Sequence, residues 1–184
     1  MEQIDFQTSL IYRVHERCSL MKRAITWLCL LILFTGCAPR VATLIPTSLP
    51  STASEAQTVL IKFFALLNSK QYADADTLYG GDYEQLKVFS SDTNPTDHAK
   101  LWADACQLAG LQCLEVRSAT FKNLQGNTYI FQVEFSNPDG SLFVLGPCCG
   151  ANETEMPPVS QFEYTVGRNA YHQYVVMNLP PYVP

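Results

Sequence analysis

Basic side chains are scarce in this sequence. Its 184 residues include 12 Lys and Arg against 17 Asp and Glu, which gives a net charge of −5 at pH 7. Proteins that bind nucleic acid usually carry a surplus of clustered Lys and Arg, because those side chains neutralise phosphates. The charge balance therefore argues against nucleic acid as a partner.

The sequence also lacks the motifs that mark common catalytic sites. It contains no G-x-G-x-x-G, no Walker loop, no H-E-x-x-H and no G-x-S-x-G. These patterns are typical of dinucleotide enzymes, P-loop nucleotide hydrolases, zinc proteases and serine hydrolases. Histidine is rare as well, and only His98 and His172 follow residue 37. We therefore expect no cofactor, and we favour a non-catalytic protein over an enzyme.

A hydrophobic run of membrane-spanning length is missing too. The run at residues 24–34 has 11 residues, whereas a transmembrane helix needs about 20. Residues 21–23 (Met-Lys-Arg) precede this run and residues 35–37 (Thr-Gly-Cys) follow it, which is the order of a secretory signal. The end of the run resembles a bacterial lipobox, which implies cleavage before Cys37 and acylation of its thiol. An uncleaved signal anchor and a chance apolar stretch are the alternatives.

The remaining N-terminal residues fit this signal poorly, because Glu2, Asp5 and Glu16 are acidic and a signal normally avoids acidic residues. We interpret residues 1–20 as the result of a start codon assigned too early, or else as an extended n-region. The stretch after the signal is rich in Pro, Ser and Thr without periodicity, which predicts a tether. The expected organisation is a signal peptide at 21–36, a tether at 37–53 and one domain at 54–184.

The domain is predicted to be α+β, with helices first and strands after them. Ser54 and Gln57 have the spacing of a capping box, and an amphipathic stripe of apolar residues follows. After residue 113, alternating runs separated by Gly, Pro and Asn predict antiparallel strands joined by hairpins. The expected helices begin at Ser54 and then cover 71–79, 83–89 and 96–108. The expected strands are 114–122, 128–135, 141–145, 162–166 and 171–177.

Two segments carry a family resemblance. Residues 59–68 (VLIKFFALLN) place two aromatics on the first helix, and residues 72–75 (YADA) give the second helix the pattern Y-x-x-A. With a Pro-rich exit at residues 179–182, this pattern resembles small bacterial lipoproteins of the cystatin-like, nuclear-transport-factor-2-like superfamily. The resemblance implies N-terminal helices packed on one curved antiparallel sheet, a cone that often has a pocket at its wide end. That superfamily includes isomerases, hydratases, binding modules and scaffolds, so the fold does not select a function.

Four cysteines follow Cys37, an even number that predicts disulfides in an exported chain. A bond between the adjacent Cys148 and Cys149 would need a strained ring. We therefore expect Cys106 and Cys113 to pair with Cys148 and Cys149, which would join helices to sheet. A bond from Cys106 to Cys113 is the alternative. Zinc is not expected, because the cysteine spacings differ from the paired C-x2-C knuckles of zinc sites.

The leading functional hypothesis is a protein lipid-anchored to a bacterial membrane through acylated Cys37, on the extracytoplasmic side. Its domain would bind a small apolar ligand or an envelope protein without catalysis. The first alternative is an isomerase- or hydratase-type enzyme, in which His172 acts as general base and Tyr164 or Tyr79 donates a hydrogen bond. The second alternative is a structural component of the cell envelope. Aromatic residues are numerous enough to fill the cone, which favours a scaffold over an enzyme.

Overall fold

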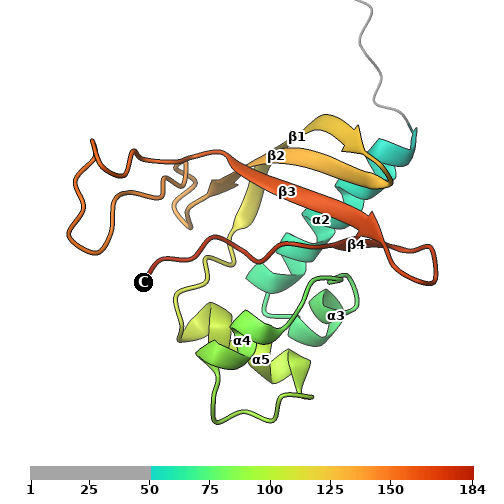
Figure 1. Cartoon of the computed structure of the whole chain (residues 1–184), viewed down its shortest axis with the longest axis horizontal. Coiled ribbons are helices and arrows are strands. Elements are labelled where there is room, and N and C mark those ends of the chain that lie inside the picture. Colours follow the sequence, from blue (N-terminus) through green and yellow to red (C-terminus); the bar gives the residue numbers. More distant parts are fainter. Residues whose placement is uncertain (1–50) are drawn as a thin grey trace, which may run out of the picture. The chain divides into compact units, whose positions relative to one another are not determined.

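Four helices precede four strands in residues 51–184, the part of the chain that the computed structural model describes (Figure 1). The helices are α2 (Ser51–Asn68), α3 (Tyr72–Asp76), α4 (Glu84–Phe89) and α5 (His98–Gln107), and the strands are β1 (Glu115–Gln125), β2 (Thr128–Ser136), β3 (Phe162–Arg168) and β4 (Tyr174–Val176). The predicted α+β class is confirmed. The predicted signal peptide, Cys37 and residues 37–50 of the predicted tether lie outside the described residues.

Helix α2 forms where the apolar stripe of the sequence predicts it, and it buries that stripe. The helix begins at Ser51, so residues 51–53 are helical and the predicted tether is too long at this end. The predicted capping box is also wrong, because Ser54 lies inside the helix. Gln57 instead donates from Nε2 to the backbone carbonyl of Ala119 in β1. The stripe residues that are at most 1 % exposed are Ala56, Leu60, Phe63, Phe64 and Leu67.

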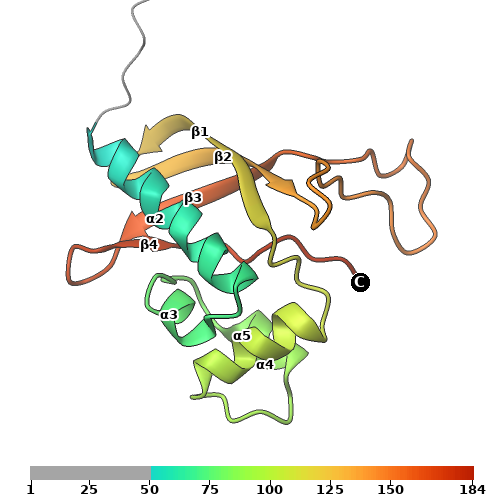
Figure 2. The same cartoon turned by 180° about the vertical axis from the view of Figure 1, so that it is seen from behind.

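The four strands form one antiparallel sheet in the order β1-β2-β3-β4. Strand β1 pairs with β2 from Glu115 opposite Ser136 to Gln125 opposite Thr128, with two register shifts on the way. Seen from behind, α2 lies across one face of this sheet (Figure 2). Alternate residues of β2 point toward the helix, since side chains along a strand alternate between its two faces.

Aromatic rings occupy the middle of the interface between α2 and the sheet. The ring centroid of Phe64 lies 4.8 Å from that of Phe135 in β2 and 5.0 Å from that of Tyr164 in β3. Phe63 packs edge-on against Trp102 of α5 at 5.6 Å. All five rings are at most 2 % exposed, and burying one such side chain stabilises the fold by roughly 1.5–3 kcal/mol. The rings thus hold helix and sheet together and fill the space between them.

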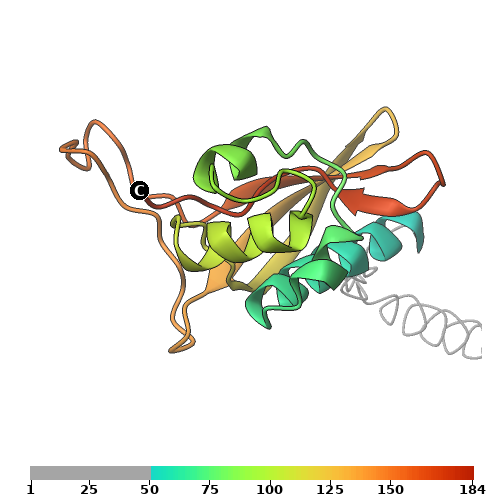
Figure 3. The same cartoon turned by 90° about the horizontal axis from the view of Figure 1, so that it is seen from below.

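The segment between β2 and β3, residues 137–161, is here called the arm. Part of it was predicted as a strand at 141–145, but it makes only isolated bridges, between Leu142 and Ser136 and between Leu145 and Val159. The N–H of Phe143 donates to the carbonyl of Phe135, whereas the N–H of Leu145 donates to the carbonyl of Val159. Because its bonds go to two different segments, this stretch forms no continuous ladder with either. The arm runs beyond the end of the sheet (Figures 1 and 3).

Strand β4 is shorter than predicted, because residues 169–173 form a turn. The Asn169 side-chain oxygen accepts hydrogen bonds from the backbone N–H groups of Tyr171 and Gln173, at 2.9 and 3.0 Å. This local bonding competes with strand pairing, as Asn side chains commonly do in turns. Only Tyr174–Val176 then pairs with β3.

Backbone contacts join the segment after α3 to β4. The N–H of Gly80 donates to the carbonyl of Val176 at 2.9 Å, and the N–H of Val176 donates to the carbonyl of Leu78 at 2.8 Å. A Cβ at Gly80 would lie 2.4 Å from Cγ2 of Val175, so this close approach needs glycine. The helices are thereby attached to the β4 edge of the sheet.

The C-terminal tail is held beside the loop that follows α5. The N–H of Val183 donates to the carbonyl of Gly110 at 3.0 Å, and the N–H of Gln112 donates to the carbonyl of Pro181 at 2.7 Å. Gly110 has φ +89°, and a Cβ there would lie 2.1 Å from the carbonyl oxygen of Val183. Only glycine fits at this position, and its small size lets the tail lie against the loop.

Candidate functional site

His172 does not lie in a strand, so its predicted place in the last strand is wrong. It lies in the turn before β4 with φ +61°, and its side chain is exposed. The backbone N–H of His172 donates to the backbone carbonyl of Asn169 at 2.9 Å. A general base must lie within hydrogen-bond reach of a bound substrate, and His172 does not line the groove that contains Tyr79 and Tyr164. The turn was missed because residues 171–177 are rich in Tyr and Val, which are common in strands.

Tyr79 and Tyr164 do line one groove, of about 600 Å³, here called the tyrosine groove. The hydroxyl of Tyr164 donates to the carbonyl of Leu179 at 3.1 Å, and the hydroxyl of Tyr79 donates to the carbonyl of Asp82 at 2.9 Å. Burial raises the pKa of both phenols above the ordinary value, and for Tyr79 the charge of Asp82 adds to the effect. Both protons are thus held by the fold, which makes these tyrosines structural.

Two polar side chains that line the tyrosine groove, Asn178 and Gln161, are paired within the protein. The Asn178 oxygen accepts from the N–H of Thr165 at 2.7 Å. Gln161 donates to Glu134 at 3.0 Å, and together with Ser118 it holds the pKa of the Glu134 carboxyl below its usual value. Side chains that already pair with one another have little capacity left to fix a polar ligand.

Three residues that the sequence did not link meet among the helices. The hydroxyl of Tyr83 donates to Oδ1 of Asp76, and Nδ1 of His98 lies 3.5 Å from Oδ2 of the same carboxylate. The rings of His98 and Tyr83 stack at 3.8 Å. Burial and the hydrogen bond to Asp76 raise the pKa of Tyr83. One residue from each of α3 and α5 and one just before α4 thus form a clasp, for which the sequence contains no periodic signal.

A second carboxylate is held between α5 and the loop before it. Asp104 is 9 % exposed. It accepts a hydrogen bond from Nζ of Lys100 and another from the hydroxyl of Thr93, the latter at 2.7 Å. These two donors lower the pKa of Asp104. The carboxylate therefore stays charged and joins the loop to the helix.

A different groove lies between the arm and the C-terminal tail. It measures about 680 Å³ and is here called the cysteine groove, with Gln112, residues 143–149, Val183 and Pro184 as its lining. Most of its lining side chains are apolar, and Val144 and Val183 are 48 % and 37 % exposed. Ligand pockets are commonly about 300–1,000 Å³ with an apolar lining and few polar groups. The cysteine groove has these properties more clearly than the tyrosine groove.

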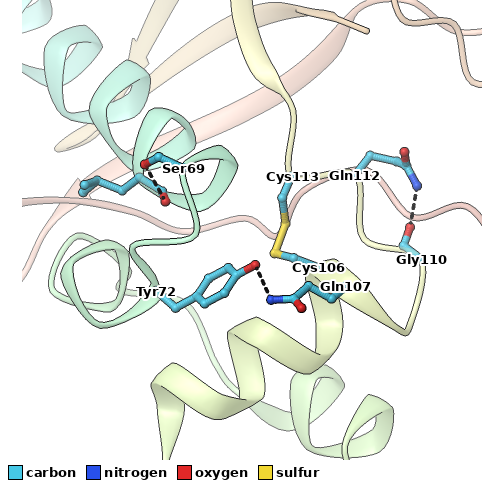
Figure 4. Close-up of a disulfide and its surroundings, with 8 residues drawn as sticks. Ser69, Tyr72, Cys106, Gln107, Gly110, Gln112 and Cys113 are labelled. Carbon is cyan, nitrogen blue, oxygen red and sulfur yellow. Dashed lines mark hydrogen bonds between the residues drawn. A yellow bond between two sulfur atoms is a disulfide. The ribbon is translucent and has the colours of Figure 1, made fainter. Parts of the chain in front are cut away.

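One disulfide is present among residues 51–184, and it joins Cys106 to Cys113 with their Cα atoms 5.6 Å apart. This is the alternative pairing, and the preferred pairing with Cys148 and Cys149 is wrong. Figure 4 shows the bond between the end of α5 and the segment that leads to β1. Gln107 beside it donates to the hydroxyl of Tyr72 at 3.1 Å. The bond closes a short loop within the helical side of the domain and does not join helices to the arm.

Cys148 and Cys149 remain, in the middle of the arm's sequence and in the lining of the cysteine groove. Their Sγ atoms lie 2.7 Å apart, and Cys149 is exposed with φ +60°. Contact with Cys149 raises the pKa of the Cys148 thiol, and burial adds to the effect. Sequence reasoning named both cysteines but assigned them the wrong partners.

Within residues 51–184, no group of three or more His, Cys, Asp or Glu side chains is arranged to hold a metal ion. No helix in the same range combines the length and the hydrophobicity that crossing a bilayer requires. In comparisons with known proteins, no family model matches this sequence, and no curated protein is significantly similar to it.

Proposed function

We propose that this chain is a lipid-anchored, extracytoplasmic binding protein that takes a small apolar ligand in the cysteine groove without catalysis. The proposed extracytoplasmic location rests on the sequence of residues 21–37, with its basic start, short apolar run and Gly-Cys end. Two acyl chains on Cys37 would anchor the protein stably, since stable membrane attachment generally takes two hydrophobic signals. The domain would then need no membrane surface of its own.

For the fold we propose membership of the cystatin-like, nuclear-transport-factor-2-like superfamily. The order of helices before an antiparallel sheet, and the placement of α2 across one sheet face, support this proposal. Such a cone often has a pocket at its wide end, which would have to open into the space between helix and sheet. In this chain Phe64, Phe135 and Tyr164 occupy that space, so we place the ligand outside the cone.

The observation that carries the binding proposal is the cysteine groove itself. It combines a suitable volume with an apolar lining from two separate segments, the arm and the tail. The tail is fixed through Gly110, so one wall of the groove is preorganised. Preorganised walls reduce the ordering cost of binding.

A protein partner is a second candidate, which the arm favours. Leu142, Val144 and Val159 are apolar side chains of the arm that are 37–48 % exposed. Exposed apolar side chains that gather on one element often mark a docking surface. An envelope protein could therefore use the same region that a small ligand would use.

Binding is tested with the fluorescent apolar probe N-phenyl-1-naphthylamine and the variant Val144→Asp. A carboxylate placed among apolar groups opposes binding, because it must lose its hydration, and we expect the probe to bind at least tenfold more weakly. Val88→Asp is the matched control, since Val88 lies on α4, is 78 % exposed and does not line the groove. Equal probe affinities in the two variants would contradict the proposed site.

The anchor is tested separately by intact mass of the full chain recovered from bacterial membranes, with Cys37→Ser as the control. We expect a chain that begins at Cys37 and carries acyl groups, and we expect the serine variant to lose both changes. A wild-type protein that keeps residues 1–36 or carries no acyl group would contradict lipid anchoring.

A further inference from the structure

The pairing of Cys106 with Cys113 changes what the other two cysteines can do. Because Cys106 and Cys113 are bonded to each other, neither is available to Cys148 or Cys149. The latter two lie in the middle of the arm's sequence, and within residues 51–184 each is the other's only cysteine neighbour at contact distance. Their chemistry is therefore that of an adjacent pair.

The local backbone turns both thiols toward each other. Cys149 has φ +60°, a conformation that non-glycine residues seldom adopt. The N–H of Ala151 donates to the carbonyl of Cys148 at 3.0 Å, which closes the turn around the pair. The Sγ atoms are 2.7 Å apart, while a disulfide bond measures about 2.05 Å. The two sulfurs are therefore less than about 1 Å farther apart than in a disulfide bond.

We propose that Cys148 and Cys149 form a reversible thiol–disulfide exchange site that closes to a disulfide between adjacent residues. Adjacent Cα atoms are about 3.8 Å apart, below the usual Cα separation of about 4.4–6.8 Å in disulfides. Strained or exposed disulfides are the more easily reduced ones. The bond would therefore open and close under conditions that leave Cys106–Cys113 intact. This inference does not depend on the groove having a ligand.

The reaction partner is a low-molecular-weight disulfide. The thiolate of Cys149 attacks one sulfur of that disulfide, forms a mixed disulfide and releases one thiolate. The thiolate of Cys148 then attacks the Cys149 sulfur, forms the Cys148–Cys149 bond and releases the second thiolate. Two electrons pass from the cysteine pair to the external disulfide, and the two thiol protons end on the two released thiolates. Reduction by two equivalents of the same thiol reverses both steps.

Exposure decides which cysteine reacts first. Cys149 is exposed and Cys148 is half-buried, so the incoming disulfide reaches Cys149 more easily. Contact with the Cys149 thiol raises the pKa of the Cys148 thiol, which favours its protonated form. Because the thiolate is the reactive form, Cys148 is the less reactive of the two before Cys149 has reacted. Cys148 is thus the resolving cysteine.

Trypsin separates the two cysteine pairs, which makes the test direct. It cleaves after Lys and Arg, and therefore places Cys106 and Cys113 in the peptide 101–117 and Cys148 and Cys149 in the peptide 123–168. The full chain is equilibrated with oxidised glutathione, alkylated, digested and weighed by mass spectrometry. We expect peptide 123–168 to take up no alkyl group before reduction and two after it. With excess reduced glutathione we expect it to take up two groups, while peptide 101–117 still takes up none.

Single variants test the order of events. Cys148→Ser should retain a glutathione adduct on Cys149, because the resolving thiol is missing, and Cys149→Ser should retain severalfold less on Cys148. The circular dichroism spectra of the two variants should match that of the wild type. The proposal is overturned if peptide 123–168 of the oxidised wild type takes up two alkyl groups, keeps a glutathione adduct, or is joined to peptide 101–117 or to a second chain.

Discussion

The core under α2 and the arm between β2 and β3 differ in how their side chains are used. In the core, Phe64, Phe135 and Tyr164 are at most 2 % exposed and fill the interface between helix and sheet. In the arm, apolar side chains such as Val144 and Val159 are 48 % and 41 % exposed, and only isolated bridges connect the backbone. The packed core and the proposed binding surface therefore lie in separate parts of this domain. The predictions below test that separation.

The largest effect is expected in the core. Phe64→Ala removes a ring that contacts both β2 and β3, and such substitutions cost about 3–5 kcal/mol of unfolding free energy. Val144→Ala in the arm should cost less than about 0.5 kcal/mol, as surface substitutions usually do. Urea unfolding followed by far-ultraviolet circular dichroism measures both. Similar losses in the two variants would remove the distinction between core and arm.

The two cysteine pairs should differ in the same way. Replacing Cys106 and Cys113 with serine removes a constraint on the unfolded chain, and for a loop of this length the expected loss is about 2 kcal/mol. Replacing Cys148 and Cys149 with serine should change stability by less than about 0.5 kcal/mol under reducing conditions. The measurement is again urea unfolding. A larger loss for the arm pair would make those cysteines structural.

A smaller effect is expected for the buried tyrosine hydroxyl. Tyr164→Phe keeps the ring in the core but leaves the carbonyl of Leu179 without its donor, which should cost about 1 kcal/mol. Tyr171→Phe is the control, because Tyr171 is 83 % exposed. Thermal unfolding of the two variants compares them. An unchanged melting temperature for Tyr164→Phe would show that this bond does not hold the tail to the sheet.

The smallest effect depends on pH. The pKa of Asp104 is lowered by Lys100 and Thr93, so its carboxylate stabilises the folded state at pH values above the unfolded-state pKa of about 3.9. That contribution is lost as the pH falls through the lower folded-state pKa. Asp104→Asn should therefore melt below the wild type at pH 7, and the difference should shrink below about pH 4. A melting-temperature difference that is the same at pH 7 and pH 3 would contradict this role.

Asp92→Asn is the matched control for the pH series. Asp92 is an exposed carboxylate in the loop between α4 and α5. Its substitution should leave the melting temperature unchanged across the same pH range.

Periodic features of the sequence predicted the core well. The stripe on α2 and the alternation in β2 identified buried residues, because burial on one face imposes a period on the chain. The prediction failed for His172, because the Tyr- and Val-rich residues 171–177 begin in a turn that Asn169 closes with its side chain. Features without a period could not be predicted.

The candidate site is one of the features that have no period in the sequence. Both walls of the cysteine groove come from irregular segments, the arm and the tail, and their contact depends on long-range backbone bonds such as that from Val183 to Gly110. The disulfide pairing was missed because sequence gives candidate pairs but no distances. The clasp of Asp76, Tyr83 and His98 likewise depends on how three short helical segments meet.

We propose that a ligand binds beside the arm and not inside the cone. Amide hydrogen exchange of the full chain, with and without N-phenyl-1-naphthylamine, distinguishes these two positions. We expect slower exchange in residues 143–149 and at Val183 on binding, with α2, β2 and β3 unchanged. Slower exchange confined to α2 and its facing strands would contradict it, because the probe would then occupy the aromatic core.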